Sequence, residues 1–280
     1  MASSTSFSNT PQATDDSFST SESLLDNGQI LFFDVMNNDL GGKAKTLFSV
    51  DNEEAIKELS QRDTAGVWEK TEDGNWITIG KDPVTGATGI LYKLSEANKS
   101  VIYSLAEGQV STDSFAYTIR LANGTLSVAT VTVTITGSND GPVITSLEQT
   151  GAVVEAGNED DGEPVAGVLT ATGKVTAIDV DNGAVLTYTG DADSTYGSFA
   201  VDAQTGDWTY TLDNTAADSL AEGDSEEEEF TVTVTDDKGA TTTQVVTITI
   251  TGTNDAPVIV AGGVVEGTVV ESGEIGRAHV

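Results

Sequence analysis

The chain lacks cysteine, has a single histidine, and carries only 12 Lys and Arg residues against 45 Asp and Glu residues. Without cysteine it can form no disulfide and perform no thiol chemistry. The histidine lies at position 279, in a tail unlike the rest of the chain, so we expect neither a Ser/His nor a Cys/His nucleophile. Residue counts leave a two-carboxylate glycosidase open. Because the acids recur in the turns of both halves, however, we expect no enzyme.

Charge and hydropathy exclude further classes. The formal net charge of −33 disfavours binding to nucleic acid or to an anionic membrane, and it makes metal cations the natural counterions. No apolar run approaches the roughly 18 residues of a membrane span. Residues 1–12 have neither the basic start nor the apolar core of a secretory signal peptide, and residues 1–13 are predicted to be a flexible lead-in. Export is still possible, since burial or metal can supply rigidity without disulfides.

An internal repeat organises the chain. Segment 134–144 ends an alternating Val/Thr/Ile run with a glycine, an Asn-Asp pair and a proline, and it returns 115 residues later as segment 249–259. Between residues 104–140 and 219–255, 16 of 37 positions are identical without a gap. Such a register indicates two units that share their final strands and their fold.

We place unit 1 at residues 14–140 and unit 2 at residues 141–255. A third copy begins at Ala256 and stops early, so residues 256–280 are interpreted as the truncated start of another repeat. The last six residues, 275–280, match nothing in the repeat and correspond to one reading frame of a sequencing adapter. Our hypothesis is that this tail is artefactual and that the natural protein is longer.

Both units are predicted to be rich in strands. In unit 1, Asn123-Gly124 between two alternating runs is a strong hairpin signal, and runs at 30–35 and 76–79 are strand-like. Unit 2 has β-branched or alternating runs at Val168–Ile178, Val185–Thr189, Ser198–Val201, Asp207–Leu212, Phe230–Thr235 and Thr241–Thr251. About six or seven short strands with closely spaced turns favour a sandwich. The predicted fold class is all-β, with tandem antiparallel β-sandwich domains joined by short linkers.

The acids form one selective pattern. Asp179 and Asp181 precede a turn, Asp236 and Asp237 lie at a hairpin, and Asn139-Asp140 lies at the joint between the units. Calcium takes six to eight oxygen ligands from carboxylates, amides and carbonyls in flexible geometry, and these residues in turns can provide them. The alternative is that Asp, Asn and Gly only form the turns.

The segment Gly197–Asn214, with the later runs Phe-Thr-Val-Thr-Val-Thr-Asp-Asp and Thr-Gly-Thr-Asn-Asp-Ala-Pro-Val, closely resembles the VCBS repeat of large bacterial surface proteins. The resemblance covers most of residues 141–259. Unit 1 resembles a variant of the same family through its segments 13–16, 38–42, 45–51 and 123–127. These repeats look like bacterial relatives of cadherin domains, which have immunoglobulin-like sandwiches. The resemblance implies secreted, often type I-exported adhesins of Gram-negative bacteria that act in attachment and biofilm formation.

A cadherin-like joint implies Ca²⁺ held by a Glu near the start of one domain, by the linker, and by an Asp-x-Asp and a late Asp of the next domain. By that resemblance, the matching residues of the first joint are Asn139, Asp140, Asp179, Asp181 and Asp236, with Glu22 as a weaker candidate. The matching residues of the next joint are Glu155, Asp213, Asn254 and Asp255. The chain departs from the cadherin pattern at both ends of each linker, with Gly137 or Gly252 at the first position and Gly141 or Ala256 at the last. In unit 1, Leu121 replaces Asp236, so we expect fewer ions per joint than in cadherins.

Two tryptophans and an acidic run have roles that their positions in the sequence indicate. Trp208 shares a strand face with Tyr210 and is predicted to lie in the core, whereas Trp68 lies near a loop and is the better sugar-stacking candidate. The acidic run 226–229 is interpreted as a solvated strand edge that discourages edge pairing.

The sequence therefore predicts calcium-stiffened spacer repeats of an extracellular adhesin at the bacterial cell surface. Its expected partners are the neighbouring repeats of the same chain and host or abiotic surfaces or glycans, with no nucleic acid and no membrane insertion in this segment. The alternatives are repeats that themselves bind glycans or surface polymers, with Trp68 as a contact, or accessory domains of a secreted enzyme.

Overall fold

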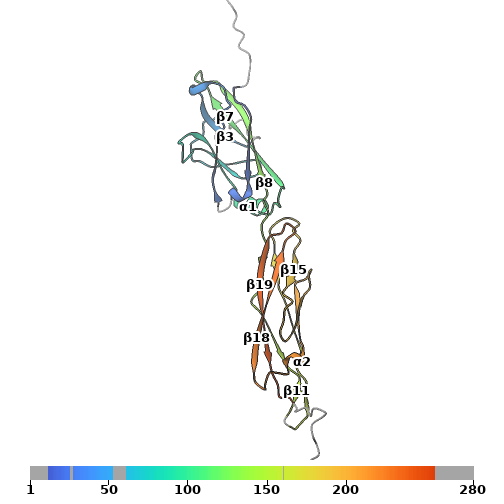
Figure 1. Cartoon of the computed structure of the whole chain (residues 1–280). Helices are drawn as coiled ribbons and strands as arrows, with labels where there is room; N and C mark the ends of the chain where they lie inside the picture. Colours follow the sequence, from blue (N-terminus) through green and yellow to red (C-terminus); the bar gives the residue numbers. More distant parts are fainter. Residues whose placement is uncertain (1–11, 26–27, 53–60, 160, 256–280) are drawn as a thin grey trace, which may run out of the picture.

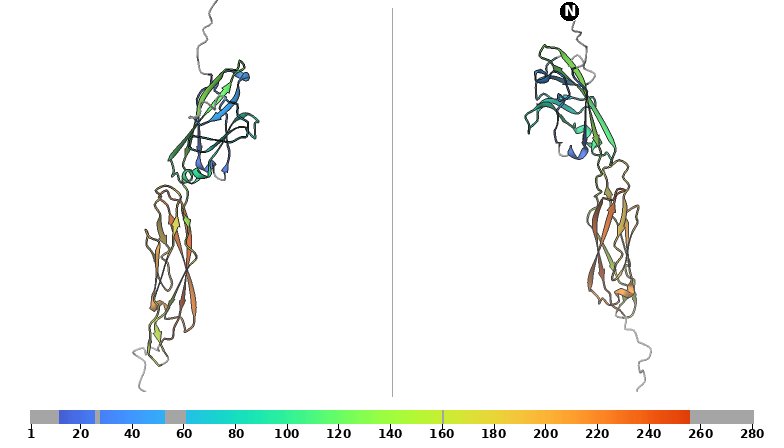
Figure 2. Two further views of the ribbon diagram at one scale, coloured as in Figure 1. Left: turned by 180° about the vertical axis from the view of Figure 1, so that it is seen from behind. Right: turned by 45° about the horizontal axis from the view of Figure 1, so that its top comes forward.

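A computed structural model describes residues 12–25, 28–52, 61–159 and 161–255. It contains two β-rich units arranged end to end, unit 1 above unit 2 in Figure 1 and in both views of Figure 2. The expected third copy and most of the expected lead-in lie outside the described residues. Within them, strands dominate, so the predicted all-β class with tandem β-sandwich domains is confirmed.

Unit 1 is built from two four-stranded sheets. The first sheet has the order β1 (Asp16–Ser21), β8 (Leu126–Thr136), β7 (Val110–Arg120) and β3 (Thr46–Asp51). The second has the order β2 (Leu31–Phe33), β6 (Thr88–Lys93), β5 (Trp76–Lys81) and β4 (Glu69–Lys70). Its helical turns are η1 (Glu22–Leu24), η3 (Gly42–Ala44) and α1 (Glu96–Ile102), of which the sequence analysis anticipated none.

Unit 2 likewise has two main sheets, one of four strands and one of three. One sheet has the order β10 (Gln149–Val154), β19 (Thr241–Thr251), β18 (Ser225–Thr235) and β15 (Thr187–Gly190). The other has the order β13 (Thr170–Lys174), β17 (Asp207–Leu212) and β16 (Gly197–Val201). Two short pairs join β9 (Val143–Ile144) to β14 (Ala177–Ile178) and β11 (Gly157–Asn158) to β12 (Pro164–Val165). The one helix among the described residues of unit 2 is α2 (Asn214–Ala217).

Alternation along the strands produces a separate core in each unit. In β19 every second side chain from Val246 to Ile250 is buried, as the Val/Thr/Ile pattern predicts. Trp208 is 1% exposed and stacks near Phe199, which in turn stacks on Phe230 with ring centroids 4.5 Å apart. The predicted core position of Trp208 is therefore confirmed.

One sheet of each unit contains a parallel pair, which the prediction of antiparallel sandwiches did not include. β1 runs parallel to β8 with Ser21 opposite Thr136, and β10 runs parallel to β19 with Val154 opposite Thr251. Because the first and last strands of that sheet point the same way in each unit, the chain enters a unit at one end and leaves it at the other. This direction allows units to follow one another along a line, and it brings the end of the first strand beside the exit linker.

A tyrosine hydroxyl pairs with an acid at matching positions of the two units, and the acid is buried in unit 1 and half-buried in unit 2. The Tyr92 hydroxyl donates to Asp113 (2.9 Å), and the Tyr210 hydroxyl donates to Glu228 (2.7 Å), 115 residues after Asp113. Glu228 also accepts a hydrogen bond from the Ser194 hydroxyl (2.9 Å). The prediction of a solvated edge was therefore wrong for this residue of the acidic run, because its carboxylate anchors the loop before β16.

The start of unit 1 also differs from the prediction. Ala13, assigned by the sequence to a flexible lead-in, is buried, and its N–H donates to the Ser127 hydroxyl (3.0 Å). Nearby, the Tyr117 hydroxyl lies within hydrogen-bond distance of Asp39 Oδ1 (3.0 Å). Burial raises the pKa of Asp16 to about 6, an effect that Tyr117 opposes and the charge of Asp39 reinforces. The first strand is thus fixed to the rest of unit 1 from its beginning.

Candidate metal centre at the joint between the units

Glu22 is a buried carboxylate at the end of unit 1 that faces unit 2. It follows β1 directly, and 3% of its surface is exposed. Its Oε1 accepts hydrogen bonds from the backbone N–H (2.7 Å) and the hydroxyl (3.0 Å) of Ser138. Its Oε2 is buried and has no hydrogen-bond partner within the described part of the chain. A buried acceptor left unpaired costs about 1–3 kcal/mol, so this oxygen is suited to a ligand.

Unit 2 presents Asp181 to the same place. Its Oδ2 accepts the backbone N–H of Asp140 in the linker (3.0 Å), and its own N–H donates to Asp179 Oδ1 (2.9 Å). Asp181 Oδ1 and Asp179 Oδ2 are buried without a partner among the residues that the structure describes. The Asp-x-Asp spacing thus lets one carboxylate position the backbone of the other while each keeps an oxygen available.

Three carboxylates meet at the joint. One oxygen each of Glu22, Asp140 and Asp181 lies within 4.8 Å of the other two. Burial, followed by the charges of Asp140 and Asp181, raises the pKa of Glu22, although the hydrogen bonds from Ser138 oppose this. Burial likewise raises the pKa of Asp181, together with the charges of Asp179 and Asp236. Both pKa shifts are caused first by burial of the carboxylate and then by the negative charges of its neighbours.

Asn139 and Asp236 fasten the linker to unit 2. Asp236 Oδ1 accepts the backbone N–H groups of residues 238–240 in the β18–β19 hairpin, and its Oδ2 accepts the Asn139 side-chain amide (2.9 Å). These hydrogen bonds, that from Asn139 first, lower the pKa of Asp236. The two units also contact each other directly, because the Asn182 N–H donates to the Ser104 carbonyl (2.9 Å).

Steric crowding explains why each linker begins with a glycine. A Cβ on Gly137 would lie 2.3 Å from the carbonyl oxygen of Leu105, and a Cβ on Gly252 would lie 2.6 Å from that of Ala221. An aspartate does not fit at either position. This departure from the cadherin pattern therefore follows from the close approach of the chain to the Leu-Ala-Glu-Gly turn of the same unit.

A second acidic group lies at the far end of unit 2. Glu155 is fully buried and follows β10 as Glu22 follows β1, and its Oε2 accepts the N–H of Thr253 (3.1 Å). Its Oε1 is buried without a partner in the described residues, and one carboxylate oxygen each of Glu155, Asp218 and Asp255 lies within 4.8 Å of the others. Burial, opposed by Thr253 and reinforced by Asp255, raises the pKa of Glu155.

The structure brings some of the expected ligands together and leaves others apart. Asp213 is outside this second group, because it caps α2 by accepting the Thr215 N–H (3.0 Å), and Asp218 at the other end of α2 takes part instead. Asn254 donates from its amide to the Asn158 carbonyl (2.9 Å). Sequence reasoning did not single out Asp218 and gave Glu22 as a weaker candidate, whereas the structure brings each of them into one of the two acidic groups. The available signal for Glu22 was its place directly after the first strand, which is also the place of Glu155.

The donors at the joint suit calcium. They are carboxylate oxygens with an amide close by, several of the oxygens are unpaired, and nitrogen or sulfur ligands, which softer metals favour, are absent from both groups as described. A cavity of about 250 Å³ adjoins Asp181 and Asn139 and is lined from unit 1 by Glu107 and Gln109. The cavity therefore brings further oxygen-bearing side chains near the three carboxylates of the joint.

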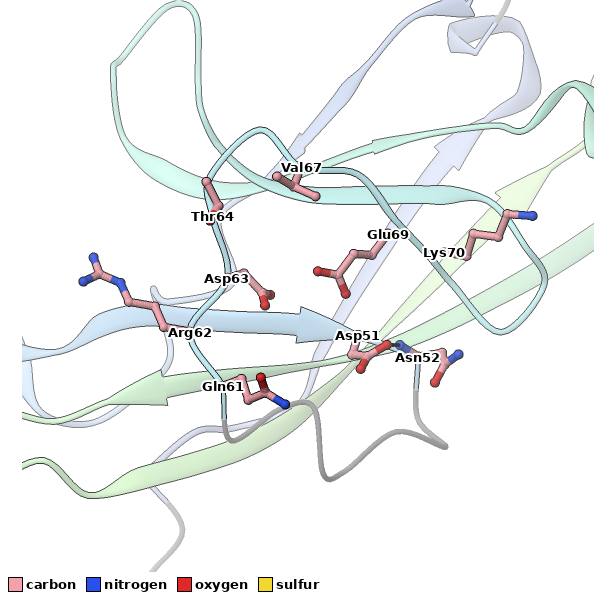
Figure 3. A pocket seen from close by; sticks show the side chains of 9 residues that line it. All are labelled: Asp51, Asn52, Gln61, Arg62, Asp63, Thr64, Val67, Glu69 and Lys70. Carbon is pink, nitrogen blue, oxygen red and sulfur yellow. Dashed lines mark hydrogen bonds between the residues drawn. The ribbon is translucent and has the colours of Figure 1, made fainter.

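Unit 1 has another acidic cavity, of about 570 Å³, into which Asp51, Asp63 and Glu69 project (Figure 3). Among the described residues only the two groups above bring three carboxylates within 4.8 Å, so this cavity is not one of the candidate metal centres. Trp68, the predicted sugar contact, has the Lys93 ammonium 4.3 Å from a ring centroid. One face of that ring is therefore covered by a cation.

The described part of the chain contains no helix long and apolar enough to cross a membrane. No curated protein matches the chain. The chain is similar to the extracellular cadherin domains 1–4 of protocadherin gamma B7, with 15% identity over 86% of this chain and 51% of that chain, and a TM-score of 0.40. It thus spans about half the length of that structure.

It is also similar to domains EC21–23 of human CDH23, with 17% identity over 86% of this chain and 69% of that chain, and a TM-score of 0.40. For EC1–3 of mouse clustered PcdhgC3, the identity is 14% over 85% of this chain and 65% of that chain, and the TM-score is 0.38. Among protein families, the bacterial cadherin-like domain matches residues 139–252. That segment, which spans nearly all of unit 2, thus corresponds to a bacterial cadherin-like domain.

Proposed function

We propose that this chain is a spacer from an extracellular bacterial adhesin, and that calcium bound at the joint between its units makes the spacer stiff. The observation that carries the proposal is the group of Glu22, Asp140 and Asp181. The three residues come from unit 1, the linker and unit 2, so a ligand shared by all three connects both units and the segment between them. The match of residues 139–252 to a bacterial cadherin-like domain supports this role.

Each residue has a distinct task. Ser138 orients Glu22 and leaves its Oε2 available, while Asp179 positions Asp181 through the backbone. Bound calcium would supply positive charge and satisfy the unpaired oxygens of the group. Without such charge, the carboxylates repel one another across the joint, and the units gain freedom to separate or swing. Neither task involves making or breaking a covalent bond, so the proposed role is not catalytic.

The second group extends the same design along the chain. Glu155, Asp218 and Asp255 repeat the combination of a buried glutamate after the first strand and an aspartate of the exit linker. We propose that this group binds calcium together with the Asp-x-Asp of a following unit. The spacer is then an array of such units at the cell surface, of the VCBS-repeat kind, and it serves attachment and biofilm formation.

Calorimetric titration of the full chain with calcium tests the proposal, with magnesium titrated in parallel. Calcium is expected to bind saturably and magnesium much more weakly, because an open cluster with flexible geometry does not meet the octahedral requirement of magnesium. Asp181→Asn should remove one binding event, whereas the exposed Asp161→Asn should leave the titration unchanged. Calcium binding that is identical in Asp181→Asn and the wild type would refute the assignment.

A further inference from the structure

Unit 1 contains a cavity lined by basic residues, which is unexpected in so acidic a chain. Nine of the 12 Lys and Arg residues lie in unit 1. Three of them, Lys45, Arg62 and Lys81, line a cavity of about 370 Å³ together with the apolar side chains of Leu47 and Ile79. The lining thus combines cations with a small apolar surface.

These cations are not neutralised by ion pairs with described residues. The salt bridges among the described residues of the whole chain involve Lys99, Lys174 and Lys238 instead. The Lys45 ammonium does donate one hydrogen bond, to the carbonyl oxygen of Asp39 (2.5 Å). One carboxylate, that of Asp63, also lines the cavity, and its Oδ2 accepts the Val50 N–H (2.6 Å). Three cations against one carboxylate leave a local excess of positive charge.

Arg62 stands between this cavity and the polar cavity of Figure 3, and both cavities are lined by Arg62 and Asp63. In Figure 3 the Arg62 side chain extends away from the carboxylates of Asp51, Asp63 and Glu69. The polar cavity adds the amides of Asn52 and Gln61. A combined site therefore offers cations on one side and a mixture of hydrogen-bond donors and acceptors on the other.

The site lies where the two units differ. In unit 1 the chain between β3 and β5 contains β4 and spans residues 52–75, of which residues 53–60 are not described, whereas in unit 2 the chain between β15 and β16 is only residues 191–196. The longer connection contributes Arg62, Asp63 and Glu69 to the cavities. Binding residues are commonly placed on loops that a rigid sheet positions, and this loop belongs to unit 1 alone.

We propose that unit 1 binds an anionic carbohydrate, with its carboxylate or sulfate held by Arg62, Lys81 and Lys45 and its hydroxyls held in the adjoining polar cavity. A guanidinium binds such an anion through two parallel hydrogen bonds. Sugar hydroxyls both donate and accept, which suits neighbouring amides and carboxylates. Negative charge elsewhere in the chain does not prevent binding, because charges beyond roughly 8–10 Å are screened at physiological ionic strength. The carboxylates of Asp51, Asp63 and Glu69 in the polar cavity instead confine the anionic group of the ligand to the side lined by cations. This ligand-binding role goes beyond the proposed spacer and does not require calcium.

Binding of polygalacturonate to the full chain tests this proposal, with uncharged dextran as the matched polymer and poly-glutamate as an acidic polypeptide. We expect polygalacturonate to bind in calcium and in chelator, and dextran and poly-glutamate to bind much more weakly. Arg62→Gln and Lys81→Gln should each weaken polygalacturonate binding by about tenfold, the effect of losing one charge-assisted contact. Both side chains are exposed, so circular dichroism should show intact folding.

The control is Lys174→Gln in unit 2, which makes the same change of charge outside the cavity. Absence of polygalacturonate binding by the wild type overturns the proposal, as does equal weakening by Lys174→Gln. Preference for poly-glutamate would contradict the assignment to a carbohydrate. Binding that needs calcium and is unchanged by Arg62→Gln would also contradict it. Loss of calcium binding at Asp181 would leave this experiment unaffected, so the two proposals fail independently.

Discussion

Replacement of Glu22 by glutamine should change stability in opposite directions with and without calcium. The amide keeps an oxygen for the hydrogen bonds from Ser138 and removes one negative charge from the group at the joint. Two carboxylates at 4.8 Å repel by about 3 kcal/mol at an effective dielectric constant of 20. Water at the joint reduces this repulsion, so Glu22→Gln should stabilise the calcium-free chain by about 1–2 kcal/mol.

With saturating calcium the effect should reverse. A site that binds at 100 times its dissociation constant stabilises the folded chain by about 2.7 kcal/mol, and loss of a carboxylate ligand removes part of that gain. Differential scanning calorimetry in chelator and in calcium measures both effects, at about 4 °C per kcal/mol for a unit of this size. The exposed Glu148→Gln serves as the control. A Glu22→Gln variant that melts earlier than wild type in chelator would show that Glu22 stabilises the joint through its hydrogen bonds alone, and would refute the reasoning.

Two further predictions concern the units themselves. The pKa of Asp16 is raised to about 6, so the folded state favours the protonated carboxyl over the ionised one. Protonation of Asp16 therefore stabilises unit 1 fully below the unfolded pKa, and this stabilisation is lost as the pH rises through 6. Asp16→Asn should therefore increase the free energy of unfolding of unit 1 at neutral pH by about 1 kcal/mol, after allowance for solvent screening, and so raise its melting temperature. The variant should also flatten the pH dependence of that stability between about pH 4 and pH 6, and an unchanged pH profile would contradict this. Trp208→Ala should destabilise unit 2 by about 3–5 kcal/mol, because it empties a buried site and removes the indole hydrogen bond to Gln149 (3.0 Å). Calorimetry should then show unit 2 melting earlier while unit 1 is unaffected, and a shift of both units would argue against separate cores.

The long strands could be predicted from the sequence because their alternation is visible locally. β17 and β19 begin and end where the alternating runs do, and the β7–β8 hairpin turns at Asn123-Gly124. In that turn Gly124 has a φ of 85°, a conformation that glycine adopts without strain. Because the last strands of the two units align without a gap, a strand assigned in one unit could also be assigned in the other.

The first strand of each unit was harder to predict. β1 is mostly polar, and its parallel pairing with β8 joins segments more than 100 residues apart. No local pattern encodes that register. The importance of Glu22 depends on it, because only the pairing of Ser21 with Thr136 places the glutamate next to Ser138 and the linker.

The choice between Asp213 and Asp218 shows a similar limit. Both acids flank α2, and the sequence alone does not say which end of so short a helix faces the linker. The orientation is set by packing, with Ala217 and Leu220 buried against unit 2. Asp213 consequently caps the helix, and Asp218 lies beside Glu155 and Asp255.

Small-angle X-ray scattering of the full chain, recorded in calcium and again after chelation, tests the central claim most directly. Calcium held by Glu22, Asp140 and Asp181 should keep the two units in one extended arrangement with a narrow distribution of distances. Chelation should restore repulsion within the group, alter the radius of gyration and broaden that distribution, and Asp181→Asn should give the chelated profile even in calcium. A radius of gyration and a distance distribution that are the same in both conditions would contradict stiffening of the joint by calcium.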